Sequence, residues 1–594
     1  MTQPAINDFS ISIATKNGSG SAAANTILYK SIFKMGIPCS SKNIFPSNIQ
    51  GLPTWYQIRV SGEGYLARNE IIDFAVMFND ETIARDVKAV RPGGVILYDD
   101  SVPMPPGIPK DSAKWIGIPA WQLVKDHIAA PQLREKQRNL IYVGALAKLL
   151  GMPLDVLRQV LKDTFGSKPE AIESNLLCIK LGYEHVDRAA LGQDAGRLQA
   201  IAGGTAGKIM TDGNTSCALG ALFGGVTVVA WYPITPSTSL AEEIMARAPK
   251  FRAEPDGKLR IAVIQAEDEL AAANMVLGAG FAGARTMTAT SGPGLSLMQE
   301  AVGLGYFAEI PGVYVIVQRG GPATGQPTRT QQADIKLMHH GSHGDTRHVV
   351  LCPHDNATAF ELTTRAFDLA DRLQTPVFVA SDLDIGMNMS NSTPFVYPEQ
   401  PLDRGKLLDE AAVRAQAGKF RRYADVDGDA IPQRTIPGNA APGAAYFCRG
   451  SGHDESARYS EDAAVYKGTL DRLRRKYETA RKVVPPPLLM NGNGSREGLI
   501  TFGSTCEPAR EAVDRLAQRK RKLDHLLLRA LPLSAQVEAF IAKHEVVFVA
   551  EQNRDGQMAE IMRAEYPQLA PRLRSVLVYD GLPPTAAQLM RQMD

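Results

Sequence analysis

The sequence predicts a multidomain α/β protein built on doubly wound, mostly parallel sheets. The chain has 594 residues, which is too long for a single hydrophobic core. In three regions, short runs rich in Val, Ile and Leu alternate with stretches of helical periodicity. Runs such as 226–230 and 312–318 are typical of strands buried on both faces of a parallel sheet. The pattern therefore predicts three α/β domains in series.

Changes in periodicity divide the chain into four segments. Residues 1–190 hold a strand at 9–14, a helix at 22–35 and further alternation, which predicts an α/β domain. A second α/β domain is expected at 191–395, and an Ala-, Gly- and Arg-rich segment at 187–207 is the expected linker at the boundary. Clustered prolines, charge runs and weak periodicity predict a connecting arm at 396–490. Alternating strands and helices return at 491–594, the third α/β domain.

Composition excludes several classes of partner. The chain carries 65 basic and 63 acidic residues, so no excess charge favours nucleic acid or a membrane surface. The first residues show no signal peptide, and no apolar run reaches the ~18 residues that a membrane span needs. The six cysteines stand singly, which fits reduced thiols in the cytoplasm and predicts no iron–sulfur cluster in this chain: Cys39, Cys178, Cys217, Cys352, Cys448 and Cys506.

A proline-rich stretch follows the run at 226–230 and precedes a helical pattern. It reads Tyr232-Pro233-Ile234-Thr235-Pro236-Ser237. The two prolines end strand pairing, and Ser237 or Thr238 is expected to cap the helix. Such a turn lies at the carboxyl edge of a sheet, where open α/β folds bind ligands, although Pro and Thr also suit a purely structural turn.

A small-residue loop near the start, Gly18-Ser19-Gly20-Ser21, opens a predicted helix. Backbone NH groups in such a loop can cradle phosphate, but the spacing lacks the full dinucleotide fingerprint and has no P-loop lysine. A tight structural turn is the alternative.

Five segments in the same order resemble the 2-oxoacid:ferredoxin oxidoreductases over nearly the whole chain. Besides the proline-rich stretch, they are Gly213-Asn214, Glu267-Asp268-Glu269, Gly320-Gly321-Pro322-Ala323-Thr324-Gly325-Gln326-Pro327-Thr328 and Glu551-Gln552-Asn553-Arg554-Asp555-Gly556-Gln557. The resemblance implies a gamma domain at 1–190, a pyrimidine-type thiamine diphosphate domain at 191–395 and a transketolase C-terminal-like domain at 491–594. The usual Gly-Gly-Gln-Gly loop of the gamma domain is replaced by Gly18 to Ser21.

The resemblance also implies thiamine diphosphate as cofactor, with a glutamate beside its aminopyrimidine ring. Motif order favours Glu267 for that role, with Glu269 second, because Glu269 also suits the first turn of a helix. Tyr232, Pro233 and Ile234 are expected to contact the cofactor.

The 2-oxoacid substrate needs a cation for its carboxylate and donors near its carbonyl. Arg319 ends an apolar strand, where a guanidinium seldom lies without a partner. Arg319, Thr235 and Glu267 are the expected catalytic residues, and Pro236 and Ser237 are expected to line the substrate site. Arg329, in the long loop at 319–344, is the competing candidate for the carboxylate.

Other acidic and histidine clusters give weaker signals for metal binding. The loop Asp425-Val426-Asp427-Gly428-Asp429 lacks the closing glutamate of a calcium site. His339 and His343 lie four residues apart without the acid that a zinc motif would place between them. We therefore expect no metal site in this chain.

The magnesium–diphosphate motif of thiamine enzymes, Gly-Asp-Gly followed by asparagine, is not found on a strand. The family resemblance assigns Mg²⁺, the diphosphate site and a [4Fe-4S] cluster to a separate beta subunit, with ferredoxin as acceptor and a dimer of alpha–beta heterodimers as assembly.

The stretch from Asn43 through Pro46 and Gly51 to Trp55 resembles the variant of the gamma domain that is found in enzymes for 2-oxoglutarate. The expected reaction converts 2-oxoglutarate and coenzyme A to succinyl-coenzyme A and CO₂, or runs in reverse. A pyruvate or branched-chain 2-oxoacid enzyme and a noncatalytic scaffold subunit are the alternatives.

Overall fold

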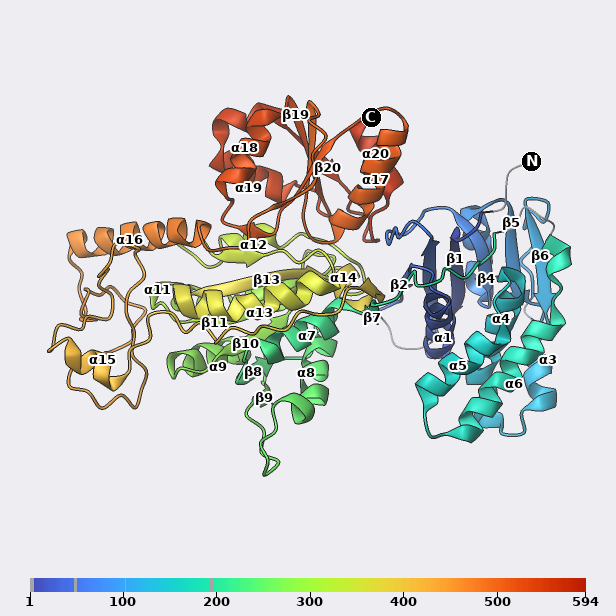
Figure 1. Ribbon diagram of the computed structural model, residues 1–594, viewed down its shortest axis with the longest axis horizontal. Helices are drawn as coiled ribbons and strands as arrows, with labels where there is room; N and C mark the ends of the chain where they lie inside the picture. The colour runs from blue at the N-terminus through green and yellow to red at the C-terminus, as the bar shows by residue number, and fades with distance from the viewer. Residues whose placement is uncertain (1–4, 48–50, 102, 192–195) are drawn as a thin grey trace.

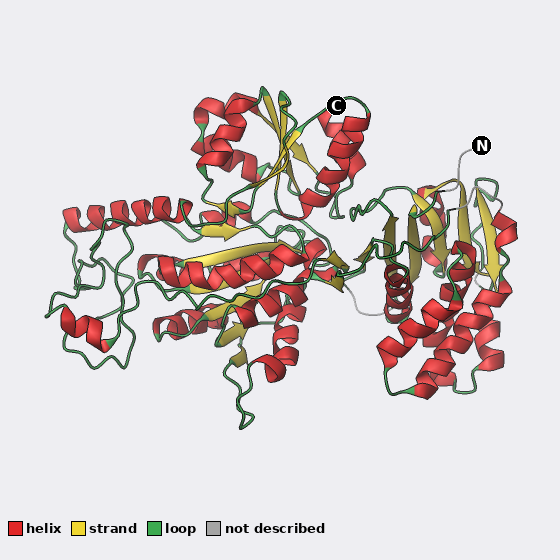
Figure 2. Cartoon of the chain, in the orientation of Figure 1, coloured by secondary structure: helices red, strands yellow, loops and turns green. Residues whose placement is uncertain are grey.

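The computed structural model describes residues 5–47, 51–101, 103–191 and 196–594, and these residues form three α/β units and an arm (Figures 1 and 2). The three sheets have eight, seven and five strands. Most neighbouring strands of the second and third sheets run parallel. The predicted fold class is confirmed. Residues 48–50 of the segment at 43–55, and part of the linker at 187–207, lie outside the described residues.

The first sheet has the strand order β6-β5-β4-β1-β3-β2-β14-β7. Phe9, Ile11 and Ile13 of β1 point into a core with the helices that lie along one face of this sheet (Figure 1). The strand β3 runs antiparallel to β1, which the sequence pattern did not predict. The strands are β1 (Asp8–Lys16), β2 (Cys39–Ile44), β3 (Pro53–Ser61), β4 (Ile72–Met77), β5 (Val90–Asp99), β6 (Ala113–Ile118), β7 (Ile209–Thr211) and β14 (Ser390–Ser392), and the helices are α1 (Ser21–Lys34), α2 (Ile83–Asp86), α3 (Ala120–His127), α4 (Pro131–Leu150), α5 (Leu154–Phe165) and α6 (Pro169–His185).

The second sheet, of order β18-β12-β13-β11-β10-β8-β9, is doubly wound. Val313, Val315 and Val317 of β11 join a core with α7 and α13, while Tyr314 and Ile316 join a core with α9 on the opposite face. The strands are β8 (Val228–Trp231), β9 (Ala262–Gln265), β10 (Thr286–Thr290), β11 (Gly312–Gln318), β12 (Val349–Leu351), β13 (Pro376–Asp382) and β18 (Ala530–Leu531). The helices are α7 (Gly213–Phe223), α8 (Thr238–Phe251), α9 (Glu269–Phe281), α10 (Gly292–Leu297), α11 (Gln299–Phe307), α12 (Ile335–His339), α13 (Asn356–Leu373) and α14 (Leu383–Met387).

The third sheet, of order β15-β17-β16-β19-β20, lies above the second in Figure 1. Ile500 and Val549 share one continuous core with β11 and α9 of the second unit, so the two units pack as neighbours. Leu499 and Phe548 face a separate core with α17 and α20. The elements are β15 (Leu488–Asn491), β16 (Glu497–Thr501), α17 (Cys506–Gln518), β17 (Asp524–Leu527), α18 (Ala535–Lys543), β19 (Val546–Glu551), α19 (Gln557–Glu565), β20 (Leu573–Leu577) and α20 (Ala586–Met593).

The arm contains a short helix, α15 (Glu410–Ala415), and a 19-residue helix, α16 (Ala463–Arg481), that the sequence did not predict. The face that α16 buries carries Arg472 and Lys476, each 6% exposed or less, which pair with Glu309, two residues after the end of α11. Buried charges do not produce an apolar stripe, and hydrophobic periodicity therefore does not reveal this helix.

The sheets cross the predicted domain boundaries in three places. β7 and β14 belong by sequence to the second unit but complete the first sheet, and β18, from the last hundred residues, pairs with β12. In the described part of the chain, no helix is long and apolar enough to cross a bilayer.

Candidate active site

The proline-rich turn connects β8 to α8 at the carboxyl edge of the second sheet. The NH groups of Ser237 and Thr238 both donate to the carbonyl of Ile234, at 2.9 and 3.1 Å. The Ser237 hydroxyl donates to the same carbonyl at 3.1 Å and does not cap α8. The capping contact expected of Ser237 is therefore replaced by a turn closed on Ile234.

Arg319 follows β11 and reaches this turn. Its Nη1 donates to the Thr235 carbonyl at 2.7 Å, and its Nη2 donates to the Thr324 carbonyl at 3.3 Å. Arg319 is 7% exposed, and its Nε has no hydrogen-bond partner among the described residues. Burial lowers the pKa of the guanidinium, and the charges of Asp334 and Glu269 oppose that shift. The fold thus brings Thr235 and Arg319 together, through the backbone of Thr235 rather than its side chain.

Glu267 and Glu269 differ in their surroundings. Glu267 is exposed in the turn after β9. Asp268 caps α9 through a 2.7 Å bond from the NH of Ala271, and Glu269 is the first residue of that helix and only 8% exposed. A Cβ at Gly294 would lie 3.0 Å from Glu269 Oε1, so the absent side chain at Gly294 leaves room for this carboxylate. Glu269, ranked second by sequence, is therefore the more buried of the two glutamates, and its charge acts on Arg319.

Asp334 is a site residue that sequence reasoning missed. Its NH donates at 3.0 Å to the side chain of Gln318, the residue before Arg319. A Cβ at Gly292 would lie 2.7 Å from Asp334 Oδ2, and this oxygen is buried without a hydrogen-bond partner among the described residues. Burial raises the pKa of Asp334 to about 6, and Arg319 opposes the shift. No local motif marks Asp334, because it reaches the site only when the loop at 319–344 folds back.

The side chain of Arg329 contacts the first unit rather than the proline-rich turn. Its Nη1 donates at 2.9 Å to the carbonyl of Phe45 in the first unit, and also to Thr328. Its backbone carbonyl accepts from Gly320 at 2.8 Å. Burial lowers the pKa of Arg329, and the nearby positive charge of Arg85 lowers it further. These contacts favour a link between the loop and the first unit over a role beside Arg319.

The motif Glu551 to Gln557 fastens the third unit to the same loop. Gln332 and Gln552 exchange two hydrogen bonds, at 2.8 and 3.1 Å. Asn553 Nδ2 donates to the Gln332 carbonyl at 3.0 Å, and Gln557 Nε2 donates to the Ala333 carbonyl at 2.7 Å. This motif therefore supports the loop that carries Asp334.

The loop from Gly18 to Ser21 is covered by α4. Asn139 Nδ2 donates to the Ser19 carbonyl at 2.7 Å, and a Cβ at Gly20 would lie 3.1 Å from the side chain of Lys136. Gly20 has a φ of 81°, in the region that favours glycine. These contacts favour the tight structural turn over a phosphate cradle.

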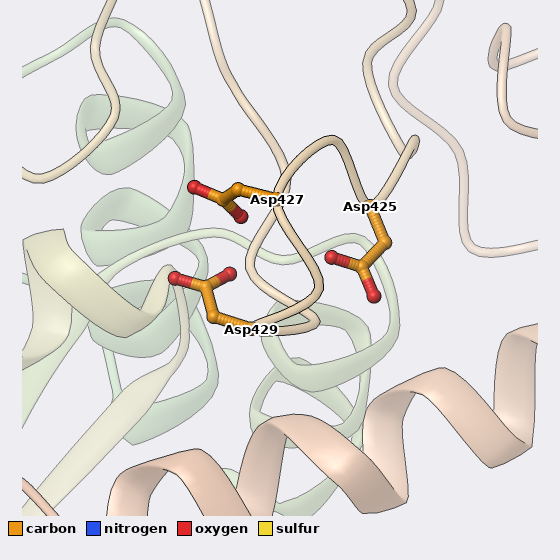
Figure 3. Close-up of side chains that lie close together, drawn as sticks. All are labelled: Asp425, Asp427 and Asp429. Atoms are coloured by element: carbon orange, nitrogen blue, oxygen red, sulfur yellow. The ribbon is translucent and has the colours of Figure 1, made fainter.

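Three aspartates, Asp425, Asp427 and Asp429, project from one loop of the arm (Figure 3). Lys406 Nζ donates to Asp427 at 2.6 Å and to Asp429 at 2.7 Å, while Asp425 accepts from backbone NH groups within the loop. An ammonium group thus already balances this cluster.

The fold and this edge together define a multidomain α/β protein whose candidate site combines a cation, two acids and a proline-rich turn. The family description "Pyruvate flavodoxin/ferredoxin oxidoreductase, thiamine diP-bdg" matches residues 219–447, and "Pyruvate ferredoxin/flavodoxin oxidoreductase" matches residues 10–185. The chain is 31% identical over 610 residues to subunit alpha of 2-oxoacid:ferredoxin oxidoreductase 2 of Aeropyrum pernix, a match that covers 94% of this chain and 93% of that one. The chain belongs to the 2-oxoacid:ferredoxin oxidoreductase family, as an alpha-type subunit.

Two further comparisons concern 2-oxoglutarate enzymes. The 2-oxoglutarate oxidoreductase subunit KorA of Mycobacterium tuberculosis is 30% identical over 442 residues, which cover 73% of this chain and 64% of that one. The solved 2-oxoglutarate:ferredoxin oxidoreductase of Magnetococcus marinus, with 2-oxoglutarate, coenzyme A and succinyl-CoA bound, is 29% identical, with a TM-score of 0.87 over 99% of both chains.

Proposed function

We propose that this chain is the fused gamma–alpha subunit of an enzyme that oxidises 2-oxoglutarate with coenzyme A. The products are succinyl-coenzyme A, CO₂, one proton and two reduced ferredoxins, and the reaction can run in reverse. The observation that carries the proposal is Arg319, whose buried guanidinium contacts the Thr235 turn while Nε remains without a partner among the described residues. A buried cation of this kind suits a carboxylate substrate.

The proposal for the substrate rests on the first unit. The segment at 43–55, which resembles that of 2-oxoglutarate enzymes, contacts the site loop because the Phe45 carbonyl accepts from Arg329. The similarity to the Magnetococcus marinus structure extends over this unit as well. Both observations support 2-oxoglutarate over the alternative substrates, pyruvate and branched-chain 2-oxoacids.

Glu269 is the residue that we now rank first for the thiamine diphosphate cofactor, with Glu267 second. When bound, the cofactor supplies the carbon nucleophile that attacks the substrate carbonyl, once a carboxylate has exchanged a proton with its aminopyrimidine ring. The buried carboxylate of Glu269, opposite Gly294 at the start of α9, fits that requirement. Glu267 is exposed and fits it only if another chain covers it.

We assign the substrate contacts to Arg319 and to residues 235–237 of the turn. Arg319 would hold the carboxylate through its remaining NH groups, with Thr235, Pro236 and Ser237 forming the adjoining wall. The contact of Arg319 with the Thr235 carbonyl fixes the guanidinium relative to this wall. Arg329 would link the loop to the first unit, and its role toward the substrate is tested below.

The remaining parts of the enzyme belong to a beta subunit. The lone cysteines, five of them buried, and the lack of a Gly-Asp-Gly motif in the sequence support a partner that carries Mg²⁺, the diphosphate site and a [4Fe-4S] cluster. Ferredoxin would accept electrons from that cluster. The expected assembly is a dimer of alpha–beta heterodimers.

A substrate profile of the purified complex tests the proposal. We expect kcat/KM for 2-oxoglutarate, followed by ferredoxin or dye reduction, to exceed that for pyruvate and for 2-oxoisovalerate by at least about tenfold. Preference for either competitor would replace the substrate assignment. No coenzyme A-dependent reduction with any 2-oxoacid would favour the noncatalytic scaffold.

A further inference from the structure

The Gly213-Asn214 pair, which the proposed chemistry does not use, lies directly beneath the proline-rich turn. Asn214 is the second residue of α7 and 1% exposed. Its Nδ2 donates to the Pro236 carbonyl at 2.8 Å and to the Ser239 hydroxyl at 2.8 Å. One amide group therefore holds the end of the turn and the first turn of α8.

The orientation of this amide is set by its partners. A carbonyl oxygen only accepts, so the nitrogen of Asn214 must face Pro236. The amide oxygen points to Gly386 of α14, where a Cβ would lie only 2.8 Å away. A Cβ at Gly213 would lie 2.6 Å from the carbonyl of Ile385. The two glycines let α7 approach α14 closely enough to bring Asn214 under the turn.

The turn in question also carries the partner of Arg319. The Thr235 carbonyl, which accepts from Arg319, precedes the Pro236 carbonyl, which accepts from Asn214. A shift of this backbone changes the position of the guanidinium relative to Thr235. Displacements of about 1 Å in such a constellation can lower turnover by roughly a hundredfold.

We propose that Asn214 is a positioning residue, which fixes the Thr235–Pro236 backbone so that Arg319 meets the 2-oxoacid in the productive geometry. The inference rests on the proposed function, because it acts through the substrate site. A positioning role explains why a small side chain with NH donors occupies position 214 and why Gly213 and Gly386 lie beside it.

Asn356 offers a matched control. It is the first residue of α13, it is 3% exposed, and its Nδ2 donates to the Thr211 carbonyl at 2.7 Å and to the Ser390 hydroxyl at 3.0 Å. Asn356 thus donates to the same two kinds of acceptor as Asn214, a backbone carbonyl and a serine hydroxyl. Asn356 supports β7 and β14, however, and neither of its acceptors lies in the proline-rich turn.

The test compares Asn214→Ala with Asn356→Ala in the complex with its partner chain. We expect similar falls in Tm, since each variant loses two buried hydrogen bonds of the same type. For Asn214→Ala, kcat/KM for the 2-oxoacid should fall at least about tenfold, and the KM for coenzyme A should stay within about twofold. Asn356→Ala should keep kcat/KM within about twofold of the parent value. Equal losses of kcat/KM in the two variants would overturn the inference.

A double-mutant cycle with Arg319→Lys tests the connection itself. If Asn214 acts through Arg319, Asn214→Ala should lower kcat/KM by a clearly smaller factor in the Arg319→Lys background than in the parent enzyme. Independent, multiplicative losses would count against the positioning role. An inactive parent complex would instead reject the proposed function.

Asn214→Asp keeps the size of the side chain but lacks the two NH donors. If Asn214→Ala does not assemble with the partner chain, Asn214→Asp takes its place. The same fall in kcat/KM is then expected. Should neither variant assemble, a structural role would account for Asn214 and the inference would be withdrawn.

Discussion

The guanidinium of Arg319 donates to the backbone carbonyl of Thr235 at 2.7 Å. This contact joins the end of β11 to the turn after β8, two segments separated by more than eighty residues in the chain. Because the carbonyls of Thr235 and Thr324 each accept from one NH₂ group of the guanidinium, the orientation of Arg319 relative to the turn is fixed. The contact gives the first prediction its geometric basis.

Replacing Arg319 by Lys should lower kcat/KM for the 2-oxoacid by roughly ten- to more than a hundredfold, because the loss of one charge-assisted contact costs about 1.5–3 kcal/mol. Lysine keeps the charge but not the planar fork, which contacts the Thr235 carbonyl and which we propose also holds the substrate carboxylate. Steady-state kinetics on the assembled complex provide the measurement.

Arg329→Lys is the internal control for that prediction. Its guanidinium donates to Phe45, so we expect a small change in kcat/KM. If Arg329→Lys lowers kcat/KM strongly and Arg319→Lys hardly at all, the carboxylate is assigned to Arg329 instead. If neither variant changes kcat/KM, the loop serves as a lid or subunit contact.

Sequence patterns predicted the strands and helices well where apolar periodicity was strong. The predicted strand 312–318 coincides with β11, and a helix was expected to start at Glu269, where α9 begins. The pairing of β7 with β14 escaped prediction, since it joins residues about 180 positions apart through three-residue strands. Short strands with little apolar content carry no period that a local pattern can detect.

The candidate site was predictable only in part. The family motifs indicated the turn, and the end of an apolar strand indicated Arg319. The choice between Glu267 and Glu269 depends on which acid the end of β9 turns inward, and sequence spacing does not determine that. Asp334 lies 15 residues beyond Arg319 within a loop, and it approaches Gly292 only through the folded loop and its contacts with the third unit.

Expressed alone, the chain should retain no iron and bind thiamine diphosphate weakly. The cysteines are isolated, and the diphosphate motif is missing from the sequence. Metal analysis of the purified chain and calorimetric titration with the cofactor and Mg²⁺ are the measurements. Stoichiometric iron, or tight cofactor binding without a partner, would refute the two-subunit arrangement.

The arm should detach on acidification or when Glu309 is neutralised. Burial alone would raise the pKa of Glu309, but Arg472 and Lys476, at 2.5 and 2.7 Å, lower it to about 2. The folded pKa lies below the unfolded value of about 4.3, so the stabilisation is present above that value and is lost as pH falls toward 2.

Glu309→Gln should therefore cost about 3–5 kcal/mol at pH 7, because it leaves two cations buried without their counter-charge. Thermal unfolding followed at pH 7 and at about pH 2.5, close to the folded pKa, checks this, and the difference in Tm between parent and variant should narrow at the lower pH. Glu410→Gln breaks an exposed pair with Arg414 and leaves an oxygen to accept from the NH of Ala440, so it should change Tm little. A constant gap would show that Glu309 acts by packing rather than by charge.

The last prediction separates the two candidate glutamates. Glu269→Gln should abolish measurable turnover, since the amide matches the carboxylate in shape but cannot exchange a proton with the aminopyrimidine. Complex formation and Tm should be retained, because glutamine keeps the size and shape of this buried side chain. Glu267→Gln, at an exposed position two residues earlier, should keep activity within about twofold. Proton–deuterium exchange at the thiazolium carbon, followed by NMR in the assembled complex, reports cofactor activation without the later steps. Slow exchange in Glu269→Gln together with normal exchange in Glu267→Gln would assign the role to the buried acid, whereas the opposite pattern would restore Glu267 and imply that the partner subunit covers it.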